Sequence, residues 1–214
     1  MQRISSRSIS DIPPAEHACF SFLEKGKAAF CGAAYPTEDS RSAAACPKAL
    51  EICGDSFLRR PALMDVAMTN ILSFASEGLF IMQDPEKHFR CAAAFLFLCK
   101  GAGRVVTAGN ALALHYRDGR INARFRFPKN PPLGSGLHSA YEASAEFELS
   151  AGTNAFLLLC GEEGSDLEAL IPPALKAPGT ADEAWAEKIM DAVRGQRCTA
   201  GAVMIPERKG FLGL

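Results

Sequence analysis

The sequence predicts an α+β protein built largely from antiparallel β-hairpins. Short apolar runs between residues 90 and 127 are separated by glycine-containing pairs such as Asp118-Gly119, which are typical of tight hairpin turns. Helical patterns gather instead at 43–53 and after Pro61. Because helices and strands occupy separate stretches and do not alternate, antiparallel sheets flanked by helices are favoured over a doubly wound parallel sheet.

The expected strands follow from short apolar or alternating runs bounded by turn residues. They fall at 18–23, 28–34, 90–100, 104–108, 111–116, 121–127, 144–149, 155–160 and 199–205. Gly26 supplies the positive φ that the first hairpin turn needs. The polar residues 1–12 show no strand pattern and are expected to be flexible. No linker or repeat divides the chain, so residues 1–214 are expected to form one domain.

Three helices are expected. The pattern over 43–53 requires Pro47 to lie in the first turn, where a missing N–H costs nothing. A second helix is predicted to begin near Pro61 and to end at Gly78. A capping box opens a third helix over 180–194. The core-facing side of the second helix is expected to comprise Leu63, Val66, Ile71 and Phe74.

Composition excludes several classes of function. The 23 Lys and Arg residues balance 24 Asp and Glu residues, giving a net charge of -1, so nucleic acid is not an expected partner. The N-terminus lacks the apolar segment of a secretory signal, and the longest apolar run, 91–99, is too short to span a membrane as a helix. We therefore expect a cytoplasmic protein that does not bind membranes. The eight cysteines contain no C-x-x-C pair and are expected to be reduced, buried residues.

Three segments carry a family resemblance. Residues 105–121 read VVTAGNALALHYRDGRI, residues 131–134 read PPLG, and residues 155–164 read AFLLLCGEEG. In their order and spacing these segments resemble the central hairpin, the P-L-G loop and the L-L-L-C-S-D-G segment of the PPM (2C-type) metal-dependent serine/threonine protein phosphatases. The two preceding helices and the closing helix and strand also fit that pattern.

The resemblance implies a β-sandwich of two antiparallel sheets with helices packed on both outer faces. In the PPM family, aspartates at strand ends hold two Mg²⁺ or Mn²⁺ ions at one edge of the sandwich. Such hard cations take anionic oxygen ligands. The ions activate a water molecule that attacks the phosphate of phosphoserine or phosphothreonine, and they balance the charge that develops on the phosphoryl oxygens.

The sequence departs from this family pattern at the metal positions. The family's N-x-D segment falls on Glu16 and His17, and its D-G-x-G-G segment places alanine at the bridging aspartate. The remaining metal positions carry an amide, one glutamate and an arginine, so no aligned aspartate is kept. The degenerate site positions are Glu16, His17, Ala34, Asn110, Glu162 and Arg197.

We therefore expect a catalytically inactive PPM-like protein that acts as a binding or regulatory module, with no metal cofactor and an unknown protein partner. A sharper form of this hypothesis has a phosphoprotein as the partner: Arg197 or Arg194 stands in for the missing metals and recognises a phosphate or carboxylate without cleaving it. The alternative is a divergent Mg²⁺- or Mn²⁺-dependent phosphatase that uses Glu162 with unaligned acids such as Glu16 or Asp39. A third possibility is an unrelated α+β domain that presents a strand edge or groove to a partner.

Overall fold

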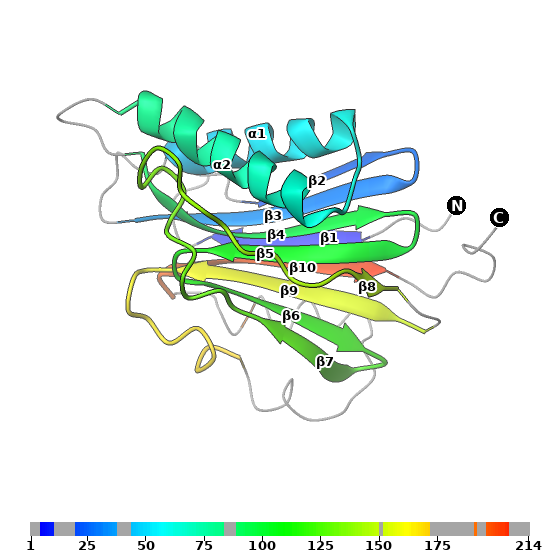
Figure 1. Cartoon of the computed structure of the whole chain (residues 1–214). Coiled ribbons are helices and arrows are strands. Elements are labelled where there is room, and N and C mark those ends of the chain that lie inside the picture. Colours follow the sequence, from blue (N-terminus) through cyan, green and yellow to red (C-terminus); the bar gives the residue numbers. More distant parts are fainter. Residues whose placement is uncertain are drawn as a thin grey trace.

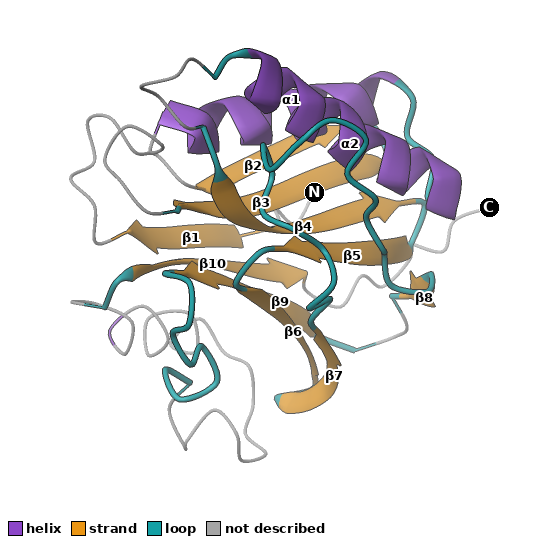
Figure 2. Ribbon diagram, turned by 60° about the vertical axis from the view of Figure 1, so that its left-hand side comes forward, coloured by secondary structure: helices purple, strands orange, loops and turns teal. Residues whose placement is uncertain are grey.

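The computed structural model describes residues 5–10, 20–37, 44–83, 89–149, 152–171, 191 and 196–205. In this part of the chain, ten strands form two five-stranded antiparallel sheets that stack face to face (Figures 1 and 2). The first sheet has the order β2-β3-β4-β5-β8, and the second has the order β1-β10-β9-β6-β7. The predicted α+β sandwich of antiparallel sheets is confirmed.

The strands are short, and tight turns join β2 to β3 and the run from β4 to β7. Their bounds are β1 Ser5–Ser10, β2 Phe20–Lys25, β3 Ala28–Pro36, β4 Cys91–Cys99, β5 Ala102–Ala108, β6 Ala111–Arg117, β7 Arg120–Phe125, β8 Phe147–Glu148, β9 Asn154–Gly161 and β10 Cys198–Ile205. Two helices, α1 (Ala45–Arg59) and α2 (Asp65–Ile81), cover the outer face of the first sheet (Figure 1).

Local turn chemistry produces the series of hairpins. Lys100 and Gly101 have φ values of 51° and 83°, and Asp118 and Gly119 have values of 49° and 76°. Positive φ at both central residues matches the right-handed twist of the flanking strands. Gly26 (φ 62°) also takes the conformation expected of it. The hairpins predicted around Gly26, Gly101 and Asp118-Gly119 are confirmed. The hairpin predicted at Gly109-Asn110 is wrong, because this turn carries the chain from β5 in the first sheet to β6 in the second. Only residues 147–148 of the predicted strand 144–149 are paired.

The N-terminal strand β1 was not predicted. It pairs antiparallel with the closing strand, from Ser5 opposite Met204 to Ser10 opposite Thr199, and it forms one edge of the second sheet. Four of the six residues of β1 are serines, which leaves no apolar alternation for a sequence pattern to detect.

The core between the sheets consists of side chains that alternate inward along both sheets. Leu96 and Val105 from the first sheet and Phe156 and Leu158 from the second belong to this cluster and are almost completely buried. A separate cluster fills the space beneath the helices, where Phe57 of α1 meets the ring of Phe97 edge-on at 5.1 Å. The seven described cysteines are reduced thiols, and six of them are buried, as predicted.

The first helix, α1, begins at Ala45 with Pro47 in its first turn, as predicted, but it runs to Arg59 rather than ending at residue 53. The second helix, α2, begins at Asp65, four residues after Pro61. The predicted end at Gly78 is wrong, because the helix continues to Ile81.

The predicted core-facing side of α2 is also wrong in part. Leu63 is buried just before the helix, but the side chains of Val66 and Phe74 are 66% and 61% exposed. The residues that face the sheet are Met68, Leu72, Ala75, Ser76 and Leu79. Because α2 is apolar on most of its circumference, spacing alone did not identify the buried side.

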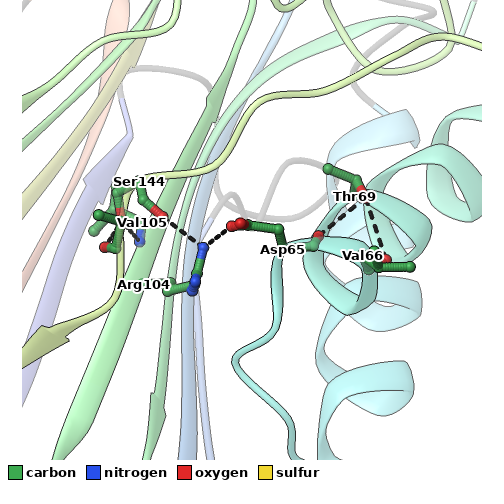
Figure 3. Close-up of polar contacts among 7 residues, drawn as sticks. Asp65, Val66, Thr69, Arg104, Val105 and Ser144 are labelled. Atoms are coloured by element: carbon green, nitrogen blue, oxygen red, sulfur yellow. Dashed lines mark hydrogen bonds and ion pairs between the residues drawn. The ribbon is translucent and has the colours of Figure 1, made fainter.

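A buried arginine ties the helical layer to the sheet (Figure 3). Arg104 of β5 donates through Nη1 to the carboxylate of Asp65, the first residue of α2, and to the carbonyl oxygen of Ser144 at 2.8 Å. The Ser144 hydroxyl in turn accepts from the N–H of Val105 at 2.9 Å. Charge-assisted bonds of this kind fix the start of α2 over β5.

The outer face of the second sheet is apolar and buried. Leu112 and Leu114 of β6 and Leu157 of β9 are at most 1% exposed, and Leu167 from the segment after β9 packs with them. Of the helix predicted at 180–194, only residue 191 is described, and it is helical. Neither described helix is long and apolar enough to cross a membrane.

Candidate functional site

Three of the predicted site residues meet at one end of the second sheet. Asn110 lies in the turn between β5 and β6, Glu162 directly follows β9, and Arg197 directly precedes β10. Two backbone hydrogen bonds hold these segments together: Gly161 N–H donates to Asn110 O at 3.1 Å, and Glu162 N–H donates to Arg197 O at 3.3 Å. Residues separated by up to 87 positions therefore share one edge of the sandwich.

The amide of Asn110 is already fully engaged. Its Nδ2 lies 2.6 Å from the carbonyl oxygen of Glu162, and 3.0 Å from both the carbonyl oxygen and the hydroxyl of Ser165. Its Oδ1, the atom that could approach a cation, accepts from Arg126 Nη2 at 3.2 Å. The side chain thus acts as a connector between the β5–β6 turn and the segment after β9.

The carboxylate of Glu162 is paired with a cation. Arg197 Nη1 lies 3.1 Å from Glu162 Oε1 and 3.3 Å from Oε2. Both side chains face solvent, with 51% of Glu162 and 78% of Arg197 exposed. Because both side chains are exposed, the ion pair contributes little to stability. It does matter for metal binding, because the positive charge of Arg197 neutralises the carboxylate that would bind the metal ion.

The nearby acid Asp166 does not complete a ligand set. Its Oδ1 accepts from the N–H groups of Glu168 at 3.0 Å and Ala169 at 3.3 Å, so it closes its own turn. Within the described residues, no group of three or more His, Cys, Asp or Glu side chains is placed to hold a metal ion. Two divalent cations require several anionic oxygens, and the described side chains at this edge do not fit them.

The other predicted site residues are not brought to this cluster. Ala34 lies in β3, opposite Ala93 of β4, and its side chain belongs to the buried layer beneath the helices. Its neighbours Ala33 and Tyr35 face the space between the sheets. Glu16 and His17 lie outside the described residues, as do Glu38, Asp39 and Arg194.

Two contributors to the cluster were not predicted. Arg126 follows the last residue of β7, and Ser165 lies in the turn that follows Glu162. Neither belongs to a motif in the sequence. They join the cluster because β6 pairs with both β7 and β9, and that pairing cannot be read from local patterns.

A second buried polar group lies further along the same sheet. His115 of β6 is 3% exposed, with Nε2 2.9 Å from Asn154 Oδ1 and Nδ1 3.2 Å from Asn122 Nδ2. Its ring stacks on Phe156 at 4.4 Å. Burial lowers the pKa of His115, opposed by the hydrogen bond to Asn154 and assisted by the charge of Arg117. Because both ring nitrogens have partners, this histidine is part of the packed structure rather than a ligand.

Comparison with solved structures identifies the architecture. The S. agalactiae serine/threonine phosphatase superposes with a TM-score of 0.71 at 10% identity, covering 96% of this chain and 99% of that one. The chain has the PPM phosphatase fold. RsbX in complex with magnesium matches with a TM-score of 0.61 at 12% identity, covering 96% of this chain and all of the other.

A further neighbour is a structure of the PP2C phosphatase domain and a fragment of the regulatory domain of SpoIIE from Bacillus subtilis. Its TM-score is 0.64 at 13% identity, with 97% of this chain and 63% of that chain covered. No protein-family model matches the chain, and no curated protein matches it in sequence. At 10–13% identity the likeness concerns the PPM fold.

Proposed function

We propose that this protein is a catalytically inactive PPM-fold module that binds a phosphorylated protein without hydrolysing it. The observation that carries the proposal is the ion pair between Glu162 and Arg197 at the sandwich edge, beside an asparagine whose amide is already engaged. It replaces the array of carboxylates that a two-metal phosphatase requires at this place.

Charge is the first argument for inactivity. A divalent cation at Glu162 would stand close to Arg197, whose Nη1 is 3.1 Å from the carboxylate. Two unit charges about 4 Å apart near a protein surface interact with roughly 4 kcal/mol, and the repulsion doubles for a divalent ion. Salt and solvent weaken this term, but it cancels much of the attraction of a single carboxylate, and little remains to replace the ion's hydration shell.

Charge is also the argument for binding an anion. Arg126 and Arg197 are both exposed and reach the cluster from two different segments, whereas Glu162 is the acid that contacts one of them. The three side chains therefore carry a net charge of +1. Guanidinium groups suit a phosphate because their planar donors form paired, charge-assisted hydrogen bonds. In this proposal the ion pair between Arg197 and Glu162 opens, and the Arg197 guanidinium binds the phosphate of the partner protein.

The test has two steps. Hydrolysis of p-nitrophenyl phosphate is measured with and without Mn²⁺ for the wild-type protein and for Glu162→Ala, and no manganese-dependent turnover is expected in either. Binding of a labelled phosphoserine peptide, with its unphosphorylated form as reference, is then followed by fluorescence anisotropy. Arg197→Ala is expected to weaken phosphopeptide binding by about tenfold or more, the usual cost of a charged hydrogen bond.

The matched control is Arg120→Ala, which removes an exposed arginine at the start of β7. It should leave peptide binding unchanged. Manganese-dependent turnover that disappears in Glu162→Ala would overturn inactivity in favour of the divergent metal phosphatase. Phosphopeptide binding that is absent, or that is equal for wild type and Arg197→Ala, would overturn phosphate recognition.

A further inference from the structure

The solvent-facing side of α2 is apolar. Val66, Phe74 and Ile81 are 66%, 61% and 74% exposed, although they are large hydrophobic residues. Their spacing of eight and seven residues places them along one stripe of the helix. Figure 1 shows α2 in the outermost layer of the molecule. Exposed Met64 and Met82 extend the stripe at its two ends.

A loop widens this stripe. The Ser73 hydroxyl donates to Ser139 O at 3.0 Å, and His138 Nδ1 lies 3.6 Å from Glu77 Oε1, so the preceding residue, Leu137, is held beside α2 with 52% of its surface exposed. A contiguous apolar surface on a protein is commonly an interaction site. The opposite side of α2 is also apolar and packs on the sheet. A helix that is apolar on both its inner and its outer side is usually covered on both.

We propose that this surface of α2 binds the same surface of a second copy of the chain, forming a dimer with two-fold symmetry. In an antiparallel pair of α2 helices, the exposed residues match around a centre between Ser73 and Phe74. Val66 then faces Ile81 of the second copy, and the exposed amide of Asn70 faces Glu77 of the second copy. A two-fold interface requires such self-complementarity, because each residue must suit the residue at its symmetry-related position.

The polar pair supports this register. Asn70 Nδ2 can donate to the carboxylate of Glu77 in the second copy, and symmetry repeats the bond on the other side of the axis. The ends match as well, because Met64 precedes α2 and Met82 follows it, so the two methionines approach each other across the interface. The interface thus has apolar contacts at its centre and ends, with polar pairs between them. This pattern favours one register of the two helices over a shifted one.

The exposed area is sufficient for a dimer. A large apolar side chain carries on the order of 150–200 Å² of surface. The six exposed side chains of the stripe and the adjoining loop therefore offer roughly 600 Å² per copy, and a pair buries about 1,200 Å², the lower limit of a specific interface. We infer a dimer of moderate affinity, whose population depends on protein concentration.

Sedimentation velocity of the full chain across a range of concentrations tests the proposal. The wild type is expected to shift from monomer to dimer as concentration rises. Phe74→Glu places two like charges at the symmetry axis and should raise the dissociation constant by at least about 100-fold. Because Phe74 is largely exposed, this variant should keep its fold, as judged by circular dichroism. Arg120→Glu, on the other sheet, is the control and should dimerise like the wild type.

Two further substitutions test the alignment. Asn70→Asp puts a carboxylate opposite Glu77 of the second copy and should weaken the dimer, more so at low salt, whereas Asn70→Lys should preserve or strengthen it. Under mild oxidation, Phe74→Cys should give a disulfide-linked dimer and Val66→Cys should not, because only residue 74 lies at the axis. A wild type that stays monomeric throughout, or a dimer that survives Phe74→Glu, would overturn the proposal.

The dimer proposal does not depend on the proposed phosphate-binding function. None of Asn110, Arg126, Glu162, Ser165 and Arg197 lies on α2. Phosphopeptide binding can therefore fail while the chain dimerises, and the reverse also holds.

Discussion

Two glycines in the helical layer meet different surroundings, and this difference predicts opposite effects of the same substitution. Gly54 of α1 faces the sheet, where an added Cβ would lie 2.7 Å from Leu23 Cδ1 and 2.9 Å from Phe30 Cδ1. Gly78 of α2 lies nearer the surface, where the nearest atom to an added Cβ would be Ile52 Cδ1 at 3.4 Å. The distances at Gly54 are shorter than two carbon atoms can approach, whereas the distance at Gly78 is an ordinary contact.

The magnitudes follow from two competing terms. Replacing glycine by alanine inside a helix stabilises it by about 1 kcal/mol, whereas forcing a methyl group into a packed core costs about 1–3 kcal/mol. Leu23 can adjust, but the Phe30 ring lies between Phe95 at 5.8 Å and Phe97 at 5.5 Å and has little room to move. We expect Gly54→Ala to lower the free energy of unfolding by about 1 kcal/mol and Gly78→Ala to raise it by about as much.

Urea unfolding followed by circular dichroism, with all proteins at one concentration, measures both changes. A fixed concentration is needed because dimerisation would add its own stabilisation. The reasoning would be refuted if Gly54→Ala stabilised the protein as much as Gly78→Ala, because helix propensity alone would then explain both results and the close approach of α1 to the sheet would carry no cost.

Two more predictions concern buried polar groups. Asp65→Asn should lower the free energy of unfolding by about 1 kcal/mol, because Arg104 is almost buried while 73% of the Asp65 side chain is exposed; equal urea midpoints for variant and wild type would contradict this. His115 has a pKa below its unfolded value of about 6.5, so protonation favours the unfolded state. Stability should therefore be constant above that pH, fall as pH drops below it and level off below the folded pKa, and this step should vanish in His115→Gln.

The sequence predicted best what short-range chemistry decides. The turn at Lys100-Gly101 and the turn at Asp118-Gly119 each require positive φ at both residues, and the chain supplies a glycine at the second position each time. The strands on either side were therefore predicted close to their true bounds. Pairing partners needed more than turn chemistry, since β9 lies between β6 and β10 although neither is joined to it by a hairpin.

Prediction was less successful in two kinds of element. In one, apolar residues lie on all sides and do not distinguish the buried side from the exposed side; in the other, apolar residues are few. For α2, residues such as Val66 and Leu72 are equally apolar, and only packing against β-strands determines that Leu72 is buried and Val66 is not. For β1, alternate burial gives no signal in a serine-rich strand, because its place in the sheet rests on backbone pairing with β10.

Some residues of the candidate site were predicted from the sequence and others were not. Asn110, Glu162 and Arg197 were expected together only through the family resemblance, and the structure joins them by direct contacts. Arg126 and Ser165 could not be anticipated, since they contact Asn110 from segments that carry no motif. Ala34, aligned with a bridging aspartate, instead has its side chain in the layer beneath the helices.

Direct side-chain contacts hold the edge of the sandwich together. In a metal site, shared ions connect ligands from separate segments. Here the Asn110 amide reaches across to Glu162 and Ser165, and the Glu162–Arg197 pair joins the segment after β9 to the one before β10. The sheets themselves are held by apolar clusters that include none of these edge side chains. Because apolar burial is the main driving force for folding, the charge pattern at the edge can vary while the fold is kept.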